Sequence, residues 1–360
     1  MSDHSFIAAS WTKYTLIFKE LAITSRARMQ TRPTYFLTLI SPEFSAGVAI
    51  GEVPLFQGLS AEDTPDFEAI LDKACRDISR CNSLEEAYAS LPEVSSIRFG
   101  FESACLRAFY NNSPWTHDPQ FDLNFNFSAT LEWLRGKTGI EINGLVWMGT
   151  KEEMHRRIRE KLDQGFHCVK LKIGGIHFED ELELLAGIRR EYTPEEIELR
   201  LDANGSFTPE NALKRLNALS DYEIHSIEQP IKPGQWEEMT RLCRQSPIPI
   251  ALDEELIGFR SDFKKAELLN AIHPQYIILK PSLCGGFVAA DHWIELAKSR
   301  NIGWWGTSAL ESNIGLEALG IWTAAHKPVI PQGLGTGHLY TNNLPSGLLL
   351  RGSKLYYTNV

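Results

Sequence analysis

The sequence predicts an α/β protein: a (β/α)8 barrel of the TIM type with an N-terminal α+β domain that caps it. Short apolar runs recur in the second half of the chain, and each ends in a charged residue 25 to 30 residues from the next. That interval is one strand plus one helix, and helical periodicity fills the gaps. Because a barrel needs only about 250 residues and the chain has 360, a second domain is expected. We place the capping domain at residues 1–130, completed by about 338–360, and the modified barrel at 131–337.

Composition and charge narrow the class of protein. Hydrophobic residues make up 43% and charged residues 23% of the chain, as in ordinary globular proteins. The net charge of −10 disfavours nucleic acid and anionic membranes as partners. No apolar run reaches the length of a membrane span and the N-terminus does not resemble a signal peptide, so we expect a cytoplasmic protein. The six cysteines form no Cys-x-x-Cys pair, and we expect them reduced. The sequence leaves the oligomeric state open, a homo-oligomer included.

The N-terminal segment alternates like antiparallel strands, at about 14–19, 34–40 and 46–50. The polar, basic stretch 24–32 between the first two strands predicts a loop. Its arginines, among them Arg26, Arg28 and Arg32, could close over an anionic substrate or simply face solvent, and both interpretations stay open. Apolar residues at helical spacing then predict helices over 65–81, from 83 onward and over 95–110. Residues 111–126, rich in Asn, Pro and Asp, are interpreted as a linker.

The barrel begins with a strand near 140–146 and continues through seven more strand-plus-helix units. The later strands are expected at 168–172, 199–202, 226–228, 250–253, 277–280, 301–306 and, beginning the eighth, 329–330. The helices are expected at 150–164, 178–192, 208–219, 236–245, 261–269, 287–300 and 315–325.

Side-chain parity places charged residues inside the barrel. In the strand 168–172, Val169 and Leu171 share one face, and Lys170 and Lys172 share the other. The apolar face of a parallel barrel lies under the outer helices, so the charged face points inward, at the ends of the strands where active sites form. Ordinary strand ends that reach solvent would explain any one of these charges. A whole set that converges on one barrel mouth requires a bound ligand.

The acids at the strand ends suit a metal ion. Asp202, Glu228 and Asp253 end three consecutive strands, and three carboxylates completed by water and substrate oxygens suit Mg²⁺, with Mn²⁺ also open. The sequence has no Cys/His cluster for zinc. Lys172 and Lys280 flank these acids from opposite sides of the barrel. A lysine beside another cation has a lowered pKa, and Lys170 supplies that neighbour for Lys172. This arrangement favours removal of a proton from the α-carbon of a carboxylate substrate.

Five short motifs at these positions carry a family resemblance: Lys170-Leu-Lys172, Asp202-Ala-Asn204, Glu228-Gln-Pro230, Asp253-Glu254 and Lys280-Pro-Ser282. In this order and spacing they are similar to the enolase superfamily, in its muconate-lactonizing-enzyme-like branch. The resemblance covers the barrel, and the preceding segment resembles the family's capping domain. It implies that Lys172 is the general base and that Lys280 lies on the opposite face of the substrate. It also implies that Asp202, Glu228 and Asp253 bind the metal, with Asn204 and Glu254 as their supporting partners.

The late loops narrow the resemblance. Residues 307–312 and 332–337 resemble those of the o-succinylbenzoate synthases, and an Asp-x-Asp that dipeptide epimerases carry near the eighth strand is replaced here by Gly335-Thr-Gly337. The resemblance implies a hydro-lyase that dehydrates 2-succinyl-6-hydroxy-2,4-cyclohexadiene-1-carboxylate through an enediolate in menaquinone biosynthesis. Ser308 and the backbone near Gly335 could contact the second carboxylate of that substrate. A racemase or epimerase of N-acylamino acids or dipeptides is the alternative enzyme, and a non-catalytic binding barrel is the third hypothesis.

Overall fold

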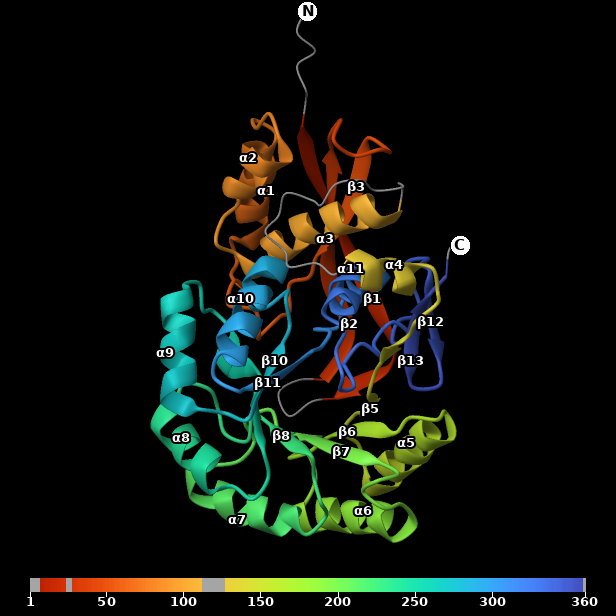
Figure 1. Ribbon diagram of the computed structural model, residues 1–360, viewed down its shortest axis with the longest axis vertical. Helices are drawn as coiled ribbons and strands as arrows, with labels where there is room; N and C mark the ends of the chain where they lie inside the picture. Colours follow the sequence, from red (N-terminus) through yellow and green to blue (C-terminus); the bar gives the residue numbers. More distant parts are fainter. Residues whose placement is uncertain (1–6, 24–27, 112–126, 359–360) are drawn as a thin grey trace, which may run out of the picture.

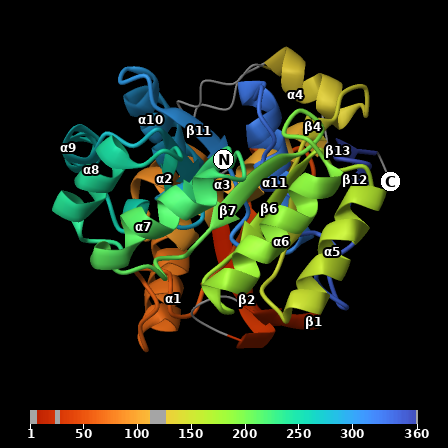
Figure 2. The same cartoon turned by 90° about the horizontal axis from the view of Figure 1, so that it is seen from below.

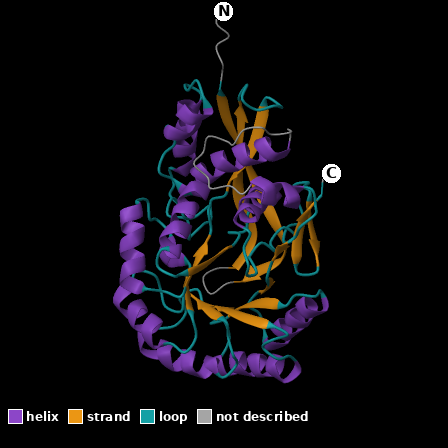
Figure 3. Cartoon of the chain, viewed as in Figure 1, coloured by secondary structure: helices purple, strands orange, loops and turns teal. Residues whose placement is uncertain are grey.

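The computed structural model describes residues 7–23, 28–111 and 127–358. An antiparallel sheet with helices beside it lies against a curled parallel sheet, and helices ring the outside of that second sheet (Figure 1). Figure 3 shows the helices along the rim and the strands inside. The predicted combination of a TIM-like barrel and an α+β cap is confirmed. None of the helices in the described ranges is long and apolar enough to cross a membrane.

The cap sheet is a three-stranded antiparallel meander, as predicted. Its strands are β1 (Ala8–Ile23), β2 (Arg28–Ile40) and β3 (Val48–Val53), in that order. The prediction of a loop over 24–32 is wrong for its second half, because β2 begins at Arg28 and Arg32 pairs with Leu16. Backbone pairing with the long strand β1 outweighs the polar composition of this stretch. The first half, Arg26 included, lies outside the described residues.

The cap helices cover one side of this sheet. They are α1 (Phe67–Ile78), α2 (Leu84–Ala89) and α3 (Ser95–Asn111), and α4 (Phe127–Leu134) follows. Helix α2 begins where predicted, because the Ser83 side chain accepts a hydrogen bond from the Glu86 backbone. Helix α3 comes so close to β3 that a Cβ on Gly51 would lie 1.9 Å from the Gly100 oxygen. The predicted linker after α3 lies, from residue 112 to 126, outside the described residues.

Seven parallel strands form the barrel wall, and each pairs with its neighbours in chain order. They are β5 (Gly144–Val146), β6 (Cys168–Lys172), β7 (Glu198–Asp202), β8 (Ser226–Glu228), β9 (Ile250–Leu252), β10 (Tyr276–Leu279) and β11 (Gly303–Gly306). The helices between and after them are α5 (Lys151–Asp163), α6 (Phe178–Glu191), α7 (Pro209–Ser220), α8 (Trp236–Gln245), α9 (Asp262–Ile272), α10 (Gly286–Lys298) and α11 (Asn313–His326). Seen from below, helices α5 to α9 follow one another around the outside (Figure 2).

The eighth position of the barrel is filled by isolated bridges. Gly333 pairs with Thr307 after β11, and Gln332 pairs with Ile142 before β5, so the wall closes. The eighth strand was predicted to begin at 329–330, but Val329 is 96% exposed and the pairing starts later.

The predicted first strand 140–146 is divided in the structure. Its start is β4 (Ile140–Glu141), which pairs with β13 (Lys354–Tyr357) next to β12 (Leu348–Arg351), and only its end, β5, enters the barrel.

Two buried glutamates of the cap contact the first turns of two barrel helices. Glu52 on β3 accepts hydrogen bonds from the backbone N–H groups of Ser312 and Gly315, each at 3.0 Å, at the start of α11. Glu102 on α3 accepts one from the Phe287 backbone at the start of α10. Helix N-termini carry unpaired N–H groups and partial positive charge, so buried carboxylates are favoured there. These contacts fix the cap over the barrel mouth.

The end of the chain runs back to the cap. The Thr341 backbone donates to the Ile17 oxygen at 2.9 Å, and the Leu339 oxygen accepts from Lys19 of the same strand at 2.8 Å. Further on, the Leu355 oxygen accepts from the Trp133 indole at 2.9 Å, and Trp133 belongs to the predicted barrel range. The C-terminal segment therefore contacts both parts, and the domain boundaries at 130 and 337 stay a prediction.

Glu102 makes the stability of the protein depend on pH. Burial raises the pKa of Glu102 to about 8 from an ordinary 4.5. Because the folded pKa is the higher one, the stabilisation is complete below 4.5 and is lost as the pH rises through 8. Relative to Glu102→Gln, the wild-type free energy of unfolding should therefore fall by about 1 kcal/mol per pH unit between these values. Urea unfolding of both proteins from pH 5 to 9 measures this difference, and parallel pH profiles would contradict it.

Candidate active site

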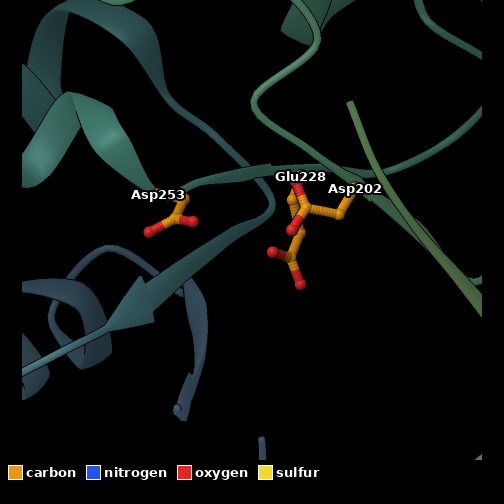
Figure 4. Close-up of side chains that lie close together, drawn as sticks. All are labelled: Asp202, Glu228 and Asp253. Carbon is orange, nitrogen blue, oxygen red and sulfur yellow. The ribbon is translucent and has the colours of Figure 1, made fainter. Parts of the chain in front are cut away.

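Three carboxylates gather where β7, β8 and β9 end. Asp202, Glu228 and Asp253 are at most 2% exposed, and each offers an oxygen within 4.8 Å of the others. Figure 4 shows them side by side at the strand ends. Adjacent parallel strands end at the same edge, so the regular strand-plus-helix interval in the sequence is what brings the three acids together. The structure thus places these three predicted residues in one cluster.

The cluster fits a divalent metal ion. Its ligands are all carboxylate oxygens, which hard cations prefer. The Oε1 atom of Glu228 is buried and has no hydrogen-bond partner among the described residues. Burial raises the pKa of Glu228, and the nearby carboxylates of Asp202 and Asp253 add to the rise although Lys170 opposes it. A bound cation would compensate both the unpaired oxygen and the mutual repulsion of the acids.

Two buried lysines, Lys170 and Lys172, and the partly buried Lys280 accompany the three acids. Lys170 donates to Glu228 at 2.9 Å, Lys172 to Asp202 at 2.7 Å and Lys280 to Asp253 at 2.5 Å. Lys170 also lies 3.3 Å from Asp202. Each acid of the cluster thus has one lysine within 2.9 Å.

The two lysines of β6 have opposite pKa shifts. Burial lowers the pKa of Lys172, and the cations of Lys170 and Lys280 lower it further against the pull of Asp202. For Lys170, burial also lowers the pKa, but the carboxylates of Glu228 and Asp202 outweigh burial and raise it above its ordinary value. Lys172 is therefore the lysine that loses its proton more readily, while Lys170 stays a cation.

Asn204 connects Lys172 to the loop that follows β9. Its Oδ1 accepts from Lys172 at 2.8 Å, and its Nδ2 donates to Glu254 at 2.9 Å. Its backbone N–H donates to Asp202 Oδ1 at 3.1 Å, in a left-handed conformation with φ 43°. Glu254 begins the short 3₁₀ helix η1 (Glu254–Leu256) directly after Asp253. Asn204 thus connects Lys172, Asp202 and Glu254, while the supporting role that the resemblance implies for Asn204 and Glu254 stays a prediction.

A cavity opens above these groups, between the barrel mouth and the cap. Ser308 and Gly335 line it, as do Lys170, Lys172, Lys280 and Asn204. The cap contributes residues 56–59, and the barrel loops contribute 307–310 and 333–336. Arg28 is exposed on β2 and is not among the described lining residues, so the structure does not bring it to the site.

The hydroxyl of Ser308 is already fully engaged. It donates to Glu311 Oε2 at 2.5 Å and accepts from the Leu310 backbone at 3.0 Å and from Thr336 Oγ1 at 2.8 Å. A hydroxyl has one proton and two lone pairs, so these three bonds use all of its capacity. Ser308 lines the cavity, but it would have to break the bond to Glu311 before it could donate to a substrate.

Sequence reasoning missed Trp147, which follows β5 and also lines the cavity. Its ring lies 5.9 Å from Lys172 Nζ, close enough for a cation–π contact. Its place directly after the first barrel strand was the signal that could have found it.

Arg32 was interpreted as either a substrate clamp or a solvent-facing charge. The structure instead buries it, and its Nη1 donates to the Leu310 oxygen.

The fold and the acid–lysine centre define a class of protein. A family model described as "Enolase C-terminal domain-like" matches residues 153–346. The chain belongs to this family, which confirms the resemblance to the enolase superfamily predicted from its motifs.

Within the family, the chain is similar to an o-succinylbenzoate synthase along nearly its whole length. The chain is 44% identical to the o-succinylbenzoate synthase of Desulfotalea psychrophila, over 96% of this chain and 98% of that protein. The crystal structure of MenC from the same organism has a TM-score of 0.76 at 42% identity and covers 98% of this chain and 100% of its own. The similarity therefore extends over cap and barrel alike.

More distant structures share the fold. A dipeptide epimerase from Enterococcus faecalis, solved with Mg and the dipeptide L-Leu-L-Tyr, has a TM-score of 0.80 at 20% identity, covering 98% of this chain and 97% of that one. A muconate lactonizing enzyme from Pseudomonas fluorescens, solved with muconolactone, has a TM-score of 0.80 at 21% identity, covering 98% and 94%. At these identities the likeness shows the fold alone.

The acid cluster should make stability depend on a divalent ion. At a concentration 100 times its dissociation constant, an ion that binds only the folded protein adds about 2.7 kcal/mol to the free energy of unfolding. Glu228→Gln should lose most of this increment because it removes one charged ligand from the cluster. Glu198→Gln, on the same barrel but at the opposite end of β7, should keep it. Urea unfolding with and without Mn²⁺ measures the increment, and equal increments in all three proteins would contradict a metal centre here.

Proposed function

We propose that this protein is an o-succinylbenzoate synthase, which dehydrates 2-succinyl-6-hydroxy-2,4-cyclohexadiene-1-carboxylate to the aromatic product in menaquinone biosynthesis. The observation that carries the proposal is the 44% identity to the Desulfotalea psychrophila synthase over 96% of the chain. The cluster of three acids and three lysines supports it independently, because it suits the removal of a proton beside a carboxylate. The cytoplasmic location and a homo-oligomeric state stay predictions.

The metal of the proposed enzyme is Mg²⁺, with Mn²⁺ as the substitute. Asp202, Glu228 and Asp253 would hold it, since an all-oxygen set of carboxylates is typical of these ions. When bound, the ion supplies positive charge that stabilises the enediolate form of the substrate carboxylate. Lys170 would stay protonated and keep Glu228 and Asp202 in place by its contacts at 2.9 and 3.3 Å.

Lys172 is the proposed general base. Its lowered pKa allows it to take the α-proton, and Asn204 and Trp147 hold its amine at the edge of the cavity. Breaking the C–H bond leaves the electron pair on the substrate as an enediolate. Lys280 directly follows β10, which is four strands away from β6 in the barrel, so it stands as a cation across from Lys172 and stabilises this negative charge.

The second step returns the proton. The electron pair of the enediolate forms the new ring double bond, and the C–O bond to the hydroxyl group breaks. The protonated Lys172 gives its proton to that hydroxyl, which leaves as water, so the base is regenerated. Because the proton leaves and returns through one amine, the elimination is syn. The product ring is aromatic, which supplies driving force for the step.

The second carboxylate of the substrate needs a partner. Ser308 was predicted for it, but its hydroxyl is fully engaged with Glu311, Thr336 and the Leu310 backbone. We assign the succinyl end to the loop around Gly335, where a Cβ would meet nothing closer than 3.6 Å. The position of Gly335 in the cavity lining and the absence of an acid from residues 335–337 are what support this assignment.

An epimerase is the alternative, because Lys172 and Lys280 lie on opposite sides of the cavity and could exchange a proton on both faces of an α-carbon. The loop at 335–337 counts against amino-acid or dipeptide substrates, since it carries no acid to hold an α-ammonium group. A non-catalytic barrel would turn over none of these compounds.

Purified protein with Mg²⁺ should convert the cyclohexadiene substrate to the aromatic product, which is followed by its absorbance. Lys172→Ala should lower turnover by about 10³-fold or more, because the only proposed proton carrier is removed. Lys298→Ala, an exposed lysine of α10, should leave it unchanged. Wild-type protein without turnover, or Lys172→Ala with full turnover, would disprove the proposed function.

Substitutions of Lys280 separate the two enzyme hypotheses. In the synthase Lys280 acts only as a cation, so Lys280→Arg should keep at least about a tenth of wild-type dehydration, whereas Lys280→Ala should lose about 10²–10³-fold. In an epimerase both substitutions would abolish inversion, because arginine does not release a proton. Dehydration rates of the variants, together with deuterium uptake by N-acylamino acids in D2O, make the distinction. Wild-type inversion faster than dehydration would favour the epimerase.

A further inference from the structure

Three non-glycine residues at the barrel mouth have left-handed backbone away from any helix end. In the parts of the chain that the structure describes, seven non-glycine residues have positive φ. Four of them follow the ends of helices, where this conformation is common: Glu223, His273, Asn301 and Lys327. The other three are Asn204, Gln229 and Leu310, and they lie in loops at the mouth of the barrel. Strained backbone away from helix ends is a pointer to function.

Gln229 directly follows Glu228 and has φ 38°. It is 0% exposed, and its side-chain amide makes four hydrogen bonds. Oε1 accepts from the backbone N–H groups of Asp253 at 3.2 Å and Glu255 at 3.3 Å. Nε2 donates to the Ile231 oxygen at 3.0 Å and to Glu255 Oε2 at 3.1 Å. One side chain therefore ties the loop after β8 to the loop after β9.

The backbone of Gln229 extends the same connection. Its oxygen accepts from the Gly205 N–H at 2.7 Å, in the loop after β7, and its N–H donates to the Ala251 oxygen of β9 at 2.9 Å. Asp202, Glu228 and Asp253 stand on the strand ends that these bonds join. Gln229 thus has hydrogen bonds to the loop after β7 and to the strand and loop that carry Asp253, while it is itself next to Glu228.

We infer that Gln229 is a positioning residue that sets the spacing of the three carboxylates for their metal ion. The inference rests on the metal centre of the proposed function. Gln229 itself contributes no ligand atom. It fixes the backbone of Asp253 from the position next to Glu228, so two ligands move together rather than separately.

An ordinary packing role does not explain these features. An apolar residue would fill the same buried space, but it would leave the four polar partners of the amide without these hydrogen bonds. Gln332 provides a comparison within the same barrel. It is also 0% exposed, its Oε1 accepts from the Gly306 backbone at 2.8 Å, and its Nε2 donates to the Ile330 oxygen at 2.8 Å. Gln332 closes the barrel wall, but it touches no acid of the cluster, and it is absent from the positive-φ residues.

The test compares Gln229→Met with Gln332→Met in the full-length protein. Methionine nearly conserves volume in both cases, so each variant loses amide hydrogen bonds without leaving a large cavity. Mn²⁺ affinity is measured by calorimetric titration, and stability in metal-free buffer is measured by urea unfolding. Loss of a group that orients metal ligands typically lowers affinity 10- to 100-fold. We expect that loss in Gln229→Met and an affinity within about twofold of wild type in Gln332→Met.

Gln229→Asn is the second variant, because it keeps the amide but shortens its reach by one methylene. It leaves a polar group beside Glu255 and is the more conservative change if methionine disrupts folding. We expect it to weaken Mn²⁺ binding at least about tenfold as well.

The outcomes separate this inference from the metal centre itself. Wild-type affinity in a folded Gln229 variant would overturn the positioning role while leaving the metal centre intact. Equal losses in Gln229→Met and Gln332→Met would also overturn it, because general loosening of the barrel would then explain both. Wild-type protein that binds no Mn²⁺ would overturn the metal centre and this inference with it.

Discussion

The structure depends on one constraint: three carboxylates and three lysines share a buried space at the end of a parallel sheet. Asp202, Glu228 and Asp253 are almost fully buried, and each is in contact with a lysine of β6 or with Lys280 directly after β10. Removing charges from water costs several kcal/mol per ion unless they are closely paired. The pairing must therefore be held by rigid strands, and the barrel provides these because its neighbouring strand ends lie side by side.

The cap domain holds parts of the barrel mouth in place. Glu52 and Glu102 bind the first turns of α11 and α10, and Arg32 binds the Leu310 oxygen of the loop that borders the cavity. Leu310 itself is left-handed with φ 65°, so this loop is held in shape by the cap rather than by its own preference. The cap therefore does more than cover the site. Its contact with Leu310 also fixes a barrel loop that lines the cavity.

Most of the fold could be predicted because strand parity and helical periodicity are local signals. The three clustered acids were predicted from regular spacing, and Lys170 and Lys172 from their shared strand face. What failed depended on partners distant in the sequence. The basic stretch before Arg32 forms a strand because β1 is long enough to pair with it. The predicted first barrel strand is divided because Ile140 pairs with the C-terminal hairpin. The engaged hydroxyl of Ser308 depends on Glu311 and Thr336, whose contacts no sequence pattern reveals.

Two lysines of β6, separated by Leu171, show how neighbouring charges determine the pKa of a side chain in this site. They lie in the same strand and point the same way, yet the pKa of Lys170 is raised and that of Lys172 is lowered. Lys170 has two carboxylates within 3.3 Å, whereas Lys172 has one carboxylate and a neutral amide, from Asn204. The additional carboxylate beside Lys170 therefore favours its protonated form, whereas Lys172 loses its proton more readily. Because Gln229 and Asn204 set where those acids stand, the backbone around the ligands controls the base as well as the metal.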